Sequence, residues 1–405
     1  MTVVTVDDAH DATPDPDTVL VSFGDISSKS REVRGKMTRR LRANVAALLD
    51  ARGVEATVDA EWARVVVHTP DPDRAARVAA DAMGVVRARP SIHMPADRDA
   101  IEDALRSLAR DASAVDTYAV RARRAGDASD HDFTSREIER GGGRAVGSVT
   151  DASVDLDDPD RTYHVEVRGD DAHVSTTSYD GPGGLPLGTQ EPLVALVSGG
   201  HDSPVAAYET MRRGAPIVPL YVSVGRYGGP DHEARAVATV RRLAGYAPNF
   251  DTRLRIVPGG DVAQRLVEDV DDTRMLSWRR AILGMAEAVA DREGAVGVVT
   301  GEAMGQKSSQ TAANLAVTDA AVDCPVHRPL FAWDKADIVD RAREIGTYED
   351  SSIPVGCERL DPPFPETGAT LDAVEAAEPD DLLDRAAAAV ADLQVVDDPT
   401  AADAR

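Results

Sequence analysis

The stretch from Leu193 to Arg213 constrains the fold more than any other part of the sequence. It opens with an apolar run, LVALV, that is typical of a buried strand, and it continues through Gly199 and Gly200 into a segment that predicts a helix over Ser203–Arg213. Glycines let a backbone approach an anion closely, and the unpaired N–H groups at a helix N-terminus attract phosphate. The stretch therefore predicts a phosphate-binding turn in an α/β domain; a tight turn built from small residues is the alternative.

Two further residues of this turn support a phosphate site. Asp202 is the residue best suited to hold Mg²⁺ on bound phosphates, because Mg²⁺ prefers a carboxylate together with phosphate oxygens. Pro204 suits the first turn of a helix, where its missing N–H costs nothing. The spacing of the glycines matches neither GxGxxG nor GxxxxGK[ST], so the turn belongs to neither of those nucleotide-binding classes.

Strand and helix patterns alternate along the second half of the chain, which predicts a doubly wound parallel sheet over residues 192–395. A final helix over Leu371–Leu393 and an acidic tail over residues 396–405 complete this half. The expected strands are Leu193–Val197, Ile217–Val222, Leu254–Val257, Ala295–Thr300 and Val326–Pro329, and the other expected helices are Ser203–Arg213, Asp231–Ala244, Asp261–Glu268, Thr273–Glu293 and Lys335–Gly346.

The first half of the chain predicts two smaller α+β units. An acidic leader, residues 1–18, precedes a β-α-β-β-α pattern over residues 19–84 that predicts a ferredoxin-like unit. A second unit of helices and strands follows over residues 85–180. A linker rich in Gly and Pro, residues 181–191, then marks the strongest domain boundary in the sequence.

The charge balance is strongly acidic, with a formal net charge of -25. Lysine is scarce, and its positions are Lys29, Lys36, Lys307 and Lys335. This composition indicates adaptation to a salt-rich cytoplasm, where a Debye length of about 3 Å at molar salt leaves only local charge to act on a partner. The negative total therefore does not exclude RNA, because basic residues cluster locally. The candidate RNA-binding residues are Arg34, Lys36, Arg39, Arg40, Arg121, Arg123, Arg124 and Arg136, although each could instead pair with a nearby Asp or Glu.

Targeting and metal-binding signals are sparse. No apolar run of about 18 residues could span a bilayer, and the acidic N-terminus does not resemble a signal peptide. Two cysteines, Cys324 and Cys357, form neither a disulfide framework nor a CxxC motif. We therefore expect a soluble, cytoplasmic protein with no membrane partner, no zinc and no iron–sulfur cluster.

The residues SGGHDS at 198–203 match the SGGxDS loop of the ATP-pyrophosphatase enzymes, which resemble one another in cleaving ATP to AMP and pyrophosphate. The segments Val299–Asn314 (VTGEAMGQKSSQTAAN) and Arg328–Thr347 (RPLFAWDKADIVDRAREIGT) resemble the tRNA 4-thiouridine synthetases, or tRNA sulfurtransferases. The resemblance extends over nearly the whole chain after residue 18. It implies a ferredoxin-like domain, a THUMP RNA-binding domain and a catalytic domain of the adenine nucleotide alpha hydrolase type, in an archaeal form without a rhodanese domain.

The same resemblance assigns roles to residues of the catalytic domain. Arg279 falls where the family places a cation, with a solvated helix face or an acidic partner as the alternative. Lys335 matches a lysine used in adenylation or tRNA binding, with an ordinary position in the first turn of a helix as the alternative. The residues implied to contact ATP are Leu196, Val197, Ser198, Gly199, Gly200, Asp202, Ser203, Tyr221, Arg279, Gly301 and Gln310.

The two cysteines take different parts in this interpretation. Cys357 lies in the loop-like stretch Ser351–Pro365 and matches the loop cysteine through which the family transfers sulfur; the nearby Arg359 would favour its thiolate. Cys324 borders an apolar strand, so a core position is one interpretation and a cysteine that resolves the persulfide is the other. The sulfur would come from an external donor, sulfide or a persulfide carrier.

The resemblance implies an enzyme that adenylates a tRNA uridine and then replaces the activated oxygen with sulfur to give 4-thiouridine. It is compatible with a homodimer. Two functions of other classes stay open at this point: an amide-forming synthetase that uses the same loop, and a non-catalytic RNA-binding protein that keeps only the nucleotide fold.

Overall fold

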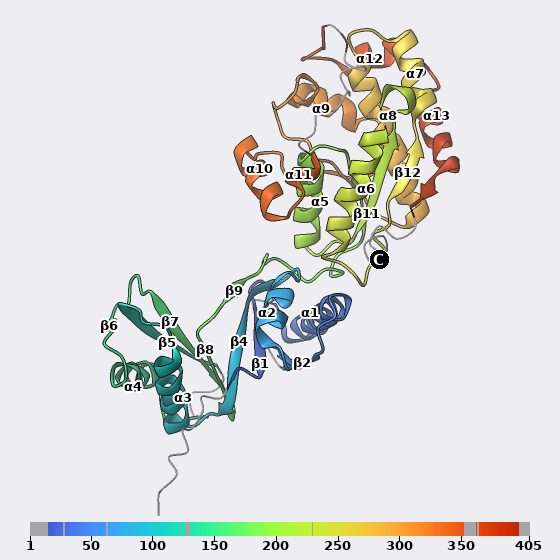
Figure 1. Cartoon of the computed structure of the whole chain (residues 1–405). Coiled ribbons are helices and arrows are strands. Elements are labelled where there is room, and N and C mark those ends of the chain that lie inside the picture. The colour runs from blue at the N-terminus through green and yellow to red at the C-terminus, as the bar shows by residue number, and fades with distance from the viewer. Residues whose placement is uncertain are drawn as a thin grey trace, which may run out of the picture. The chain divides into compact units, whose positions relative to one another are not determined.

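The chain forms two compact units, residues 1–182 and 183–405, in a computed structural model (Figure 1). The structure describes residues 15–26, 29–61, 64–125, 130–228, 230–351, 362 and 364–396. Among these residues no helix is long and apolar enough to cross a membrane.

The first unit begins with the predicted ferredoxin-like arrangement. Four strands pair in the order β2-β3-β1-β4, all antiparallel to their neighbours. Two helices pack on this sheet and bury one apolar core between helix and sheet. The elements are β1 (Thr18–Phe23), α1 (Arg31–Ala51), β2 (Thr57–Glu61), β3 (Arg64–His68), α2 (Pro72–Ala80) and β4 (Val85–Pro95).

The rest of the first unit continues the same sheet through a shared strand. Residues 85–91 of β4 pair with β1, and residues 92–95 of the same strand pair with β8. The predicted boundary between residues 84 and 85 therefore falls at the start of a strand that both halves use. The further elements are α3 (Arg98–Asp111), β5 (Thr117–Ala125), α4 (Ser135–Gly147), β6 (Ser153–Val154), β7 (Arg161–Arg168), β8 (Asp171–Ser175) and β9 (Tyr179–Asp180).

The second unit is built on a parallel sheet with the order β14-β13-β10-β11-β12 and an antiparallel edge strand, β15. Its strands are β10 (Leu193–Leu196), β11 (Ile217–Ser223), β12 (Arg255–Pro258), β13 (Val298–Val299), β14 (Val326–His327) and β15 (Gln394–Val395). Its α-helices are α5 (Asp202–Arg212), α6 (Pro230–Ala244), α7 (Gly260–Asp269), α8 (Arg274–Glu293), α9 (Ala312–Asp319), α10 (Lys335–Glu344), α11 (Tyr348–Ser351), α12 (Leu371–Ala377) and α13 (Leu382–Ala389).

Helices cover both faces of this sheet. One core packs α7, α8 and α13 against β10, β11 and β12, and a smaller core packs α6 against the opposite face of β11 and β12. Figure 1 shows α5 and α6 on one side of the strands and α8 with α13 on the other. The predicted α/β fold with a doubly wound parallel sheet is confirmed.

The single helix predicted over Leu371–Leu393 is wrong, because the chain forms two helices there. The break falls at Glu378 and Pro379: Glu378 has an extended backbone (φ -86°, ψ 156°), as the ring of a following proline demands. The break has a structural use. Glu378 turns inward and accepts hydrogen bonds of 3.1 and 3.2 Å from Nε of the buried Arg280 on α8.

The glycines of α4 allow close packing of α3 and α4. A Cβ atom at Gly142 would lie 2.6 Å from a methyl carbon of Leu105 on α3, whereas a Cβ at Gly143 would meet nothing within 4 Å. We therefore expect Gly142→Ala to destabilise the first unit by about 1–3 kcal/mol through overpacking. Gly143→Ala should leave stability unchanged or raise it by roughly 0.8–1 kcal/mol through helix propensity.

Chemical denaturation of the full chain gives the free energy of unfolding of the first unit, which is compared between each variant and the wild type. Equal effects of the two substitutions would contradict the close packing at Gly142.

Candidate active site

The segment that follows β10 lies where the order of the parallel sheet reverses. The chain continues from β10 outward through β11 and β12 on one side and returns to place β13 and β14 on the other. At such a switch point the loops after neighbouring strands diverge and leave a crevice at the carboxyl ends of the strands, where ligands bind in open α/β sheets. Residues 197–201, between β10 and α5, occupy this position.

Hydrogen bonds between its two serines close the loop. The Ser203 hydroxyl accepts a hydrogen bond of 2.8 Å from the Ser198 backbone N–H, and the two hydroxyl oxygens lie 3.1 Å apart. The Ser198 hydroxyl also accepts a bond of 3.3 Å from the Gly200 backbone N–H. The serines therefore fix the loop backbone; of the glycines between them, Gly199 is buried next to Arg235 and Gly200 is half-buried.

The helix that follows the loop begins without a side-chain cap. His201 is the N-cap of α5, and its side chain accepts no backbone N–H. The helices α1, α2, α3 and α4 have such a cap, from Ser30, Asp71, Asp97 and Thr134, whereas α7, α8, α10 and α13 lack one as α5 does. The N-terminus of α5 therefore keeps N–H groups that a phosphate could satisfy.

The segment after β13 packs directly on the loop. A Cβ atom at Gly301 would lie 2.6 Å from the Ser203 backbone nitrogen and 2.8 Å from the Asp202 carbonyl carbon. Only glycine fits this distance, because the colliding atoms belong to the backbone and cannot rotate away. Gly301 thus joins the carboxyl ends of β10 and β13.

Lys335, at the start of α10, meets the first residue of α5. Its Nζ lies 2.6 Å from Oδ1 of Asp202, and the two side chains are 49 % and 26 % exposed. His201 lies beside this pair, with Nε2 3.8 Å from the same oxygen. Burial, together with the positive charge of Lys335, lowers the pKa of His201 below its usual value. The starts of α5 and α10 therefore place a carboxylate, an uncharged imidazole and a lysine side by side at neutral pH.

The site fits Mg²⁺ that arrives with phosphates. Asp202 supplies one accessible carboxylate, and no group of three or more His, Cys, Asp and Glu side chains that could hold a metal lies together among the described residues. One carboxylate plus phosphate oxygens is the ligand set that Mg²⁺ commonly takes in nucleotide sites.

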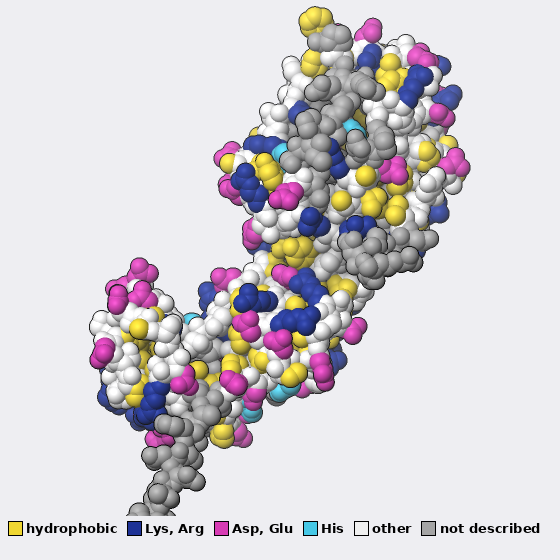
Figure 2. Space-filling view, viewed as in Figure 1, with side chains coloured by type: hydrophobic (Ala, Val, Ile, Leu, Met, Phe, Trp, Pro, Cys, Tyr) yellow, Lys and Arg dark blue, Asp and Glu magenta, His cyan; other side chains and the backbone are white. Residues whose placement is uncertain are grey.

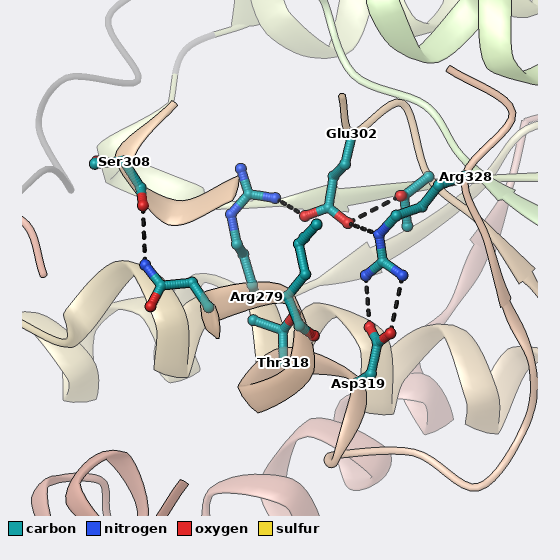
Figure 3. A network of polar contacts seen from close by, with 9 residues as sticks. Arg279, Glu302, Ser308, Thr318, Asp319 and Arg328 are labelled. Atoms are coloured by element: carbon teal, nitrogen blue, oxygen red, sulfur yellow. Dashed lines mark hydrogen bonds and ion pairs between the residues drawn. The ribbon is translucent and has the colours of Figure 1, made fainter. Parts of the chain in front are cut away.

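Charged side chains on the neighbouring segments form a network that the sequence did not predict (Figure 3). Glu302 accepts hydrogen bonds from Arg279 through Oε1 and from Arg328 through Oε2, the latter at 2.9 Å. Asp319 holds the other end of Arg328 through two bonds of 2.9 and 2.5 Å. Glu302 follows β13, and Arg328 follows the neighbouring strand β14. The carboxyl ends of adjacent parallel strands meet at one edge of a sheet, so the positions of these two residues after predicted strands could have indicated that they lie close together.

The predicted nucleotide-binding residues differ in how far their side chains are exposed. Val197 and Tyr221 are 4 % and 6 % exposed and pack in the core under α6, so their side chains support the sheet and only their backbone could contact a ligand. Leu196, at the end of β10, is half-buried. Gln310 is buried in a short 3-10 helix, Ser308–Gln310, and its Oε1 has no hydrogen-bond donor among the described residues.

The cysteines fall in different parts of the chain. Cys357 lies outside the described residues. Cys324 precedes β14, at the amino ends of the parallel strands, whereas the loop lies at their carboxyl ends. Its backbone N–H donates a bond of 2.8 Å to Glu287, eight residues beyond Arg279 on α8, or about 12 Å along the helix at 1.5 Å per residue. Cys324 therefore lies away from the loop, against the sheet core.

The candidate RNA-binding residues of α1 are partly free. Lys36 pairs with Glu32 at 2.8 Å, and the guanidinium of Arg34 donates a bond of 3.2 Å to the Lys29 carbonyl. Arg39 and Arg40 are exposed and pair with no acidic side chain among the described residues. Of the four candidates on α1, these two could contact a phosphate backbone without first breaking an ion pair or a hydrogen bond to the main chain.

The arginines of β5 and α4 divide in the same way. Arg124 donates a bond of 2.7 Å to the Phe133 carbonyl, so it holds the chain before α4. Arg121 bonds the Leu156 carbonyl. Arg123 and Arg136 are exposed, with no acidic partner in the described part of the chain. Figure 2 shows basic side chains interleaved with acidic ones on the visible surface of this unit, so any positive potential is local.

A glycine-rich loop at the switch point, an uncapped helix N-terminus and adjacent cationic side chains define a nucleotide-binding enzyme of the α/β class. Residues 188–382 match the family model described as thiamine biosynthesis protein (ThiI), and residues 95–177 match the THUMP domain. The chain is 55 % identical to a probable tRNA sulfurtransferase of Halobacterium salinarum, over 94 % of this chain and 97 % of that one.

A probable tRNA sulfurtransferase of Methanosarcina acetivorans is 36 % identical over 89 % of this chain and 88 % of its own length. Among solved structures, a 4-thiouridine synthetase in complex with RNA and bound ATP superposes with a TM-score of 0.79 at 26 % identity, over 94 % of this chain and all of that one. The chain belongs to the tRNA sulfurtransferase family.

The packing of Gly301 on the loop generates a prediction for ATP binding. Gly301→Ala should displace the loop backbone at Ser203 and weaken ATP binding at least tenfold, because a Cβ cannot be accommodated at 2.6 Å. Isothermal titration calorimetry with a non-hydrolysable ATP analogue measures the loss. Gly294→Ala is the control, since a Cβ there meets nothing within 4 Å; its positive φ strains the helix end, so it reports on stability alone. Wild-type affinity in Gly301→Ala would contradict the contact.

The environment of Cys324 generates a prediction for its reactivity. Burial, followed by the neighbouring carboxylate of Glu287, raises the pKa of Cys324 to about 11. Since the thiolate is the reactive form, alkylation of Cys324 in the Cys357→Ala variant should be slow at pH 8 and should accelerate only as the pH approaches 11. The rate of iodoacetamide labelling, measured against pH by mass spectrometry, tests this. A half-maximal rate near pH 8.5 would show that the thiol is not suppressed.

Proposed function

We propose that the chain uses the loop at Ser198–Ser203 to bind ATP, adenylates a tRNA uridine and replaces the activated oxygen with sulfur to give 4-thiouridine. The observation that carries the proposal is the loop itself: closed by Ser198 and Ser203, uncapped at α5 and placed at the switch point of the sheet. Family membership supports the same activity, and the similar 4-thiouridine synthetase binds ATP and RNA.

In the first step the loop N–H groups and the N-terminus of α5 bind the phosphates. Asp202 would hold Mg²⁺, which neutralises phosphate charge when bound. Lys335, released from Asp202, would then bind a phosphate oxygen. The uridine O4 attacks the α-phosphorus; the new O–P bond forms as the bond to pyrophosphate breaks. Positioning and charge neutralisation supply most of the rate.

In the second step a sulfur nucleophile attacks C4 of the adenylated base and AMP leaves. We assign the sulfur to a persulfide on Cys357, loaded by an external carrier, or to sulfide. If the persulfide attacks directly, the resulting S–S bond to Cys357 must be broken by a thiol. The position of Cys324 at the amino ends of the strands favours an external thiol in that role over Cys324.

RNA binding falls to the first unit in this proposal. Of the candidate RNA-binding residues, Arg39, Arg40, Arg123 and Arg136 are exposed and have no acidic partner among the described residues. Because their charge is local, we expect phosphate contacts and recognition of RNA shape rather than a long-range field. We do not include Arg124 among the proposed RNA contacts, because its guanidinium donates a hydrogen bond to the Phe133 carbonyl.

The two other functions considered from the sequence lose support. An amide-forming synthetase would not require the THUMP domain matched at residues 95–177. A non-catalytic RNA-binding protein would not require the loop, the carboxylate and the lysine to be brought together as Asp202 and Lys335 are.

Deletion of the gene, followed by complementation, tests the proposal. Transfer RNA from each strain is digested to nucleosides, and 4-thiouridine is quantified by mass spectrometry. We expect the thionucleoside to disappear on deletion, to return with the intact gene and with Cys324→Ala, and not to return with Cys357→Ala. Cys324→Ala is the matched control because it removes the other thiol of the chain.

An unchanged level of 4-thiouridine on deletion would refute the proposed function. Loss of activity in Cys324→Ala, in a protein that still unfolds at the wild-type temperature, would instead restore Cys324 as a resolving cysteine.

A further inference from the structure

We infer that Glu302 is a positioning residue that holds the Arg279 guanidinium at the nucleotide site, with Arg328 and Asp319 fixing Glu302 from the opposite side. The inference rests on the proposed role of Arg279 in nucleotide binding and concerns how that side chain is placed.

The position of Glu302 connects it to the loop. It directly follows Gly301, whose Cα packs against the backbone of Ser203, so the Glu302 backbone is fixed by the same contact that fixes the loop. The residue is only 7 % exposed. A buried carboxylate must be paired to persist, and Glu302 meets that requirement with both oxygens.

The two arginines are not equivalent. Arg328 is held by all three of its nitrogens: its Nε bonds Glu302, and its two terminal nitrogens bond the carboxylate of Asp319. Arg279 bonds Glu302 through Nη1 alone, and its Nε has no acceptor among the described residues. The Arg279 side chain remains 20 % exposed. Every nitrogen of Arg328 is thus engaged with a carboxylate, whereas Arg279 uses one of its three and is the more exposed of the two.

The two arginines therefore have different roles: Arg328 fixes Glu302, and Arg279 is the side chain that Glu302 positions. Figure 3 shows Arg279 and Arg328 approaching Glu302 from opposite sides. Thr300 adds a hydrogen bond of 3.0 Å to the oxygen that Arg328 also contacts. One oxygen of Glu302 is thus used to fix the carboxylate, and the other orients Arg279. An arginine held in one rotamer loses less side-chain entropy when it binds an anion.

Removal of the Glu302 charge should release Arg279 and leave Arg328 bound to Asp319. We expect Glu302→Gln to raise the Kd for ATP about tenfold and to raise the KM for ATP with little change in the KM for tRNA. Glu302→Asp keeps the charge on a shorter side chain that cannot reach both arginines, so it should give an intermediate Kd.

Glu378→Gln is the matched control. It makes the same change at another buried glutamate, whose carboxylate bonds Arg280, the neighbour of Arg279 on α8. The Glu378 side chain is 7 % exposed, and that of Glu302 is 9 %. If Glu302 acted only on stability, the two Gln variants would lower the unfolding temperature to similar extents and neither would change ATP affinity in the folded protein.

A double-mutant cycle separates this inference from the function on which it rests. Arg279→Ala should weaken ATP binding, and Glu302→Gln should cause no further loss in that background. Two results would overturn the positioning role of Glu302. One is that the losses of ATP affinity in the two single variants add in the double variant; the other is that Arg279→Ala binds ATP more weakly while Glu302→Gln and Glu302→Asp keep the wild-type Kd. Wild-type ATP affinity in Arg279→Ala would instead refute the nucleotide role of Arg279. Calorimetry with the full-length chain and a non-hydrolysable ATP analogue measures every arm.

Discussion

The contact between Gly301 and the backbone of Ser203 is the constraint on which the candidate site depends. Two strands that diverge from a switch point leave a crevice, but a crevice has no fixed shape unless the segments at its edge touch. Here they touch backbone to backbone, at a distance that excludes any side chain. The loop geometry, the position of Glu302 and the start of α5 are all set by that contact.

The charged side chains around this contact form ion pairs. Most of its many carboxylates are on the surface, where salt screens them. The cations near the loop are each held by a specific acid: Lys335 by Asp202, Arg328 by Asp319 and Glu302. A bound nucleotide would compete for the bond between Lys335 and Asp202, and a phosphate oxygen would replace the carboxylate as the partner of Lys335. In an acidic protein such ion pairs hold each cationic side chain at a defined position near the loop.

The sequence predicted the elements of the site better than their connections. The strand before the loop and the helix after it were correct to within one residue at their ends, because an apolar run, two glycines and a helix signal are local patterns. Glu302 was missed, because nothing local distinguishes one glutamate among 70 acidic residues. Its importance arises from Arg279 and Arg328, which lie 23 and 26 residues away.

Two further features required different kinds of information. The final helix was predicted as continuous across Pro379, although a proline inside a helical pattern is a local signal for a break. Arg124 was predicted with its neighbours on β5 as an RNA contact, and the structure shows that its guanidinium also donates to the Phe133 carbonyl. Alternation along a strand could not reveal this, since the acceptor comes from a turn that only the folded chain brings into reach.

By itself the sequence determined the class of fold, the strand, loop and helix around Ser198–Ser203, and the family, because these depend on the order of local patterns and on motifs of contiguous residues. Only the tertiary structure decided which charged residues meet. It brought Lys335 to Asp202, placed Glu302 between two arginines and put Cys324 at the end of the sheet away from the loop. The reason is that pairings between distant residues depend on strand order and on close backbone contacts, which no local pattern specifies.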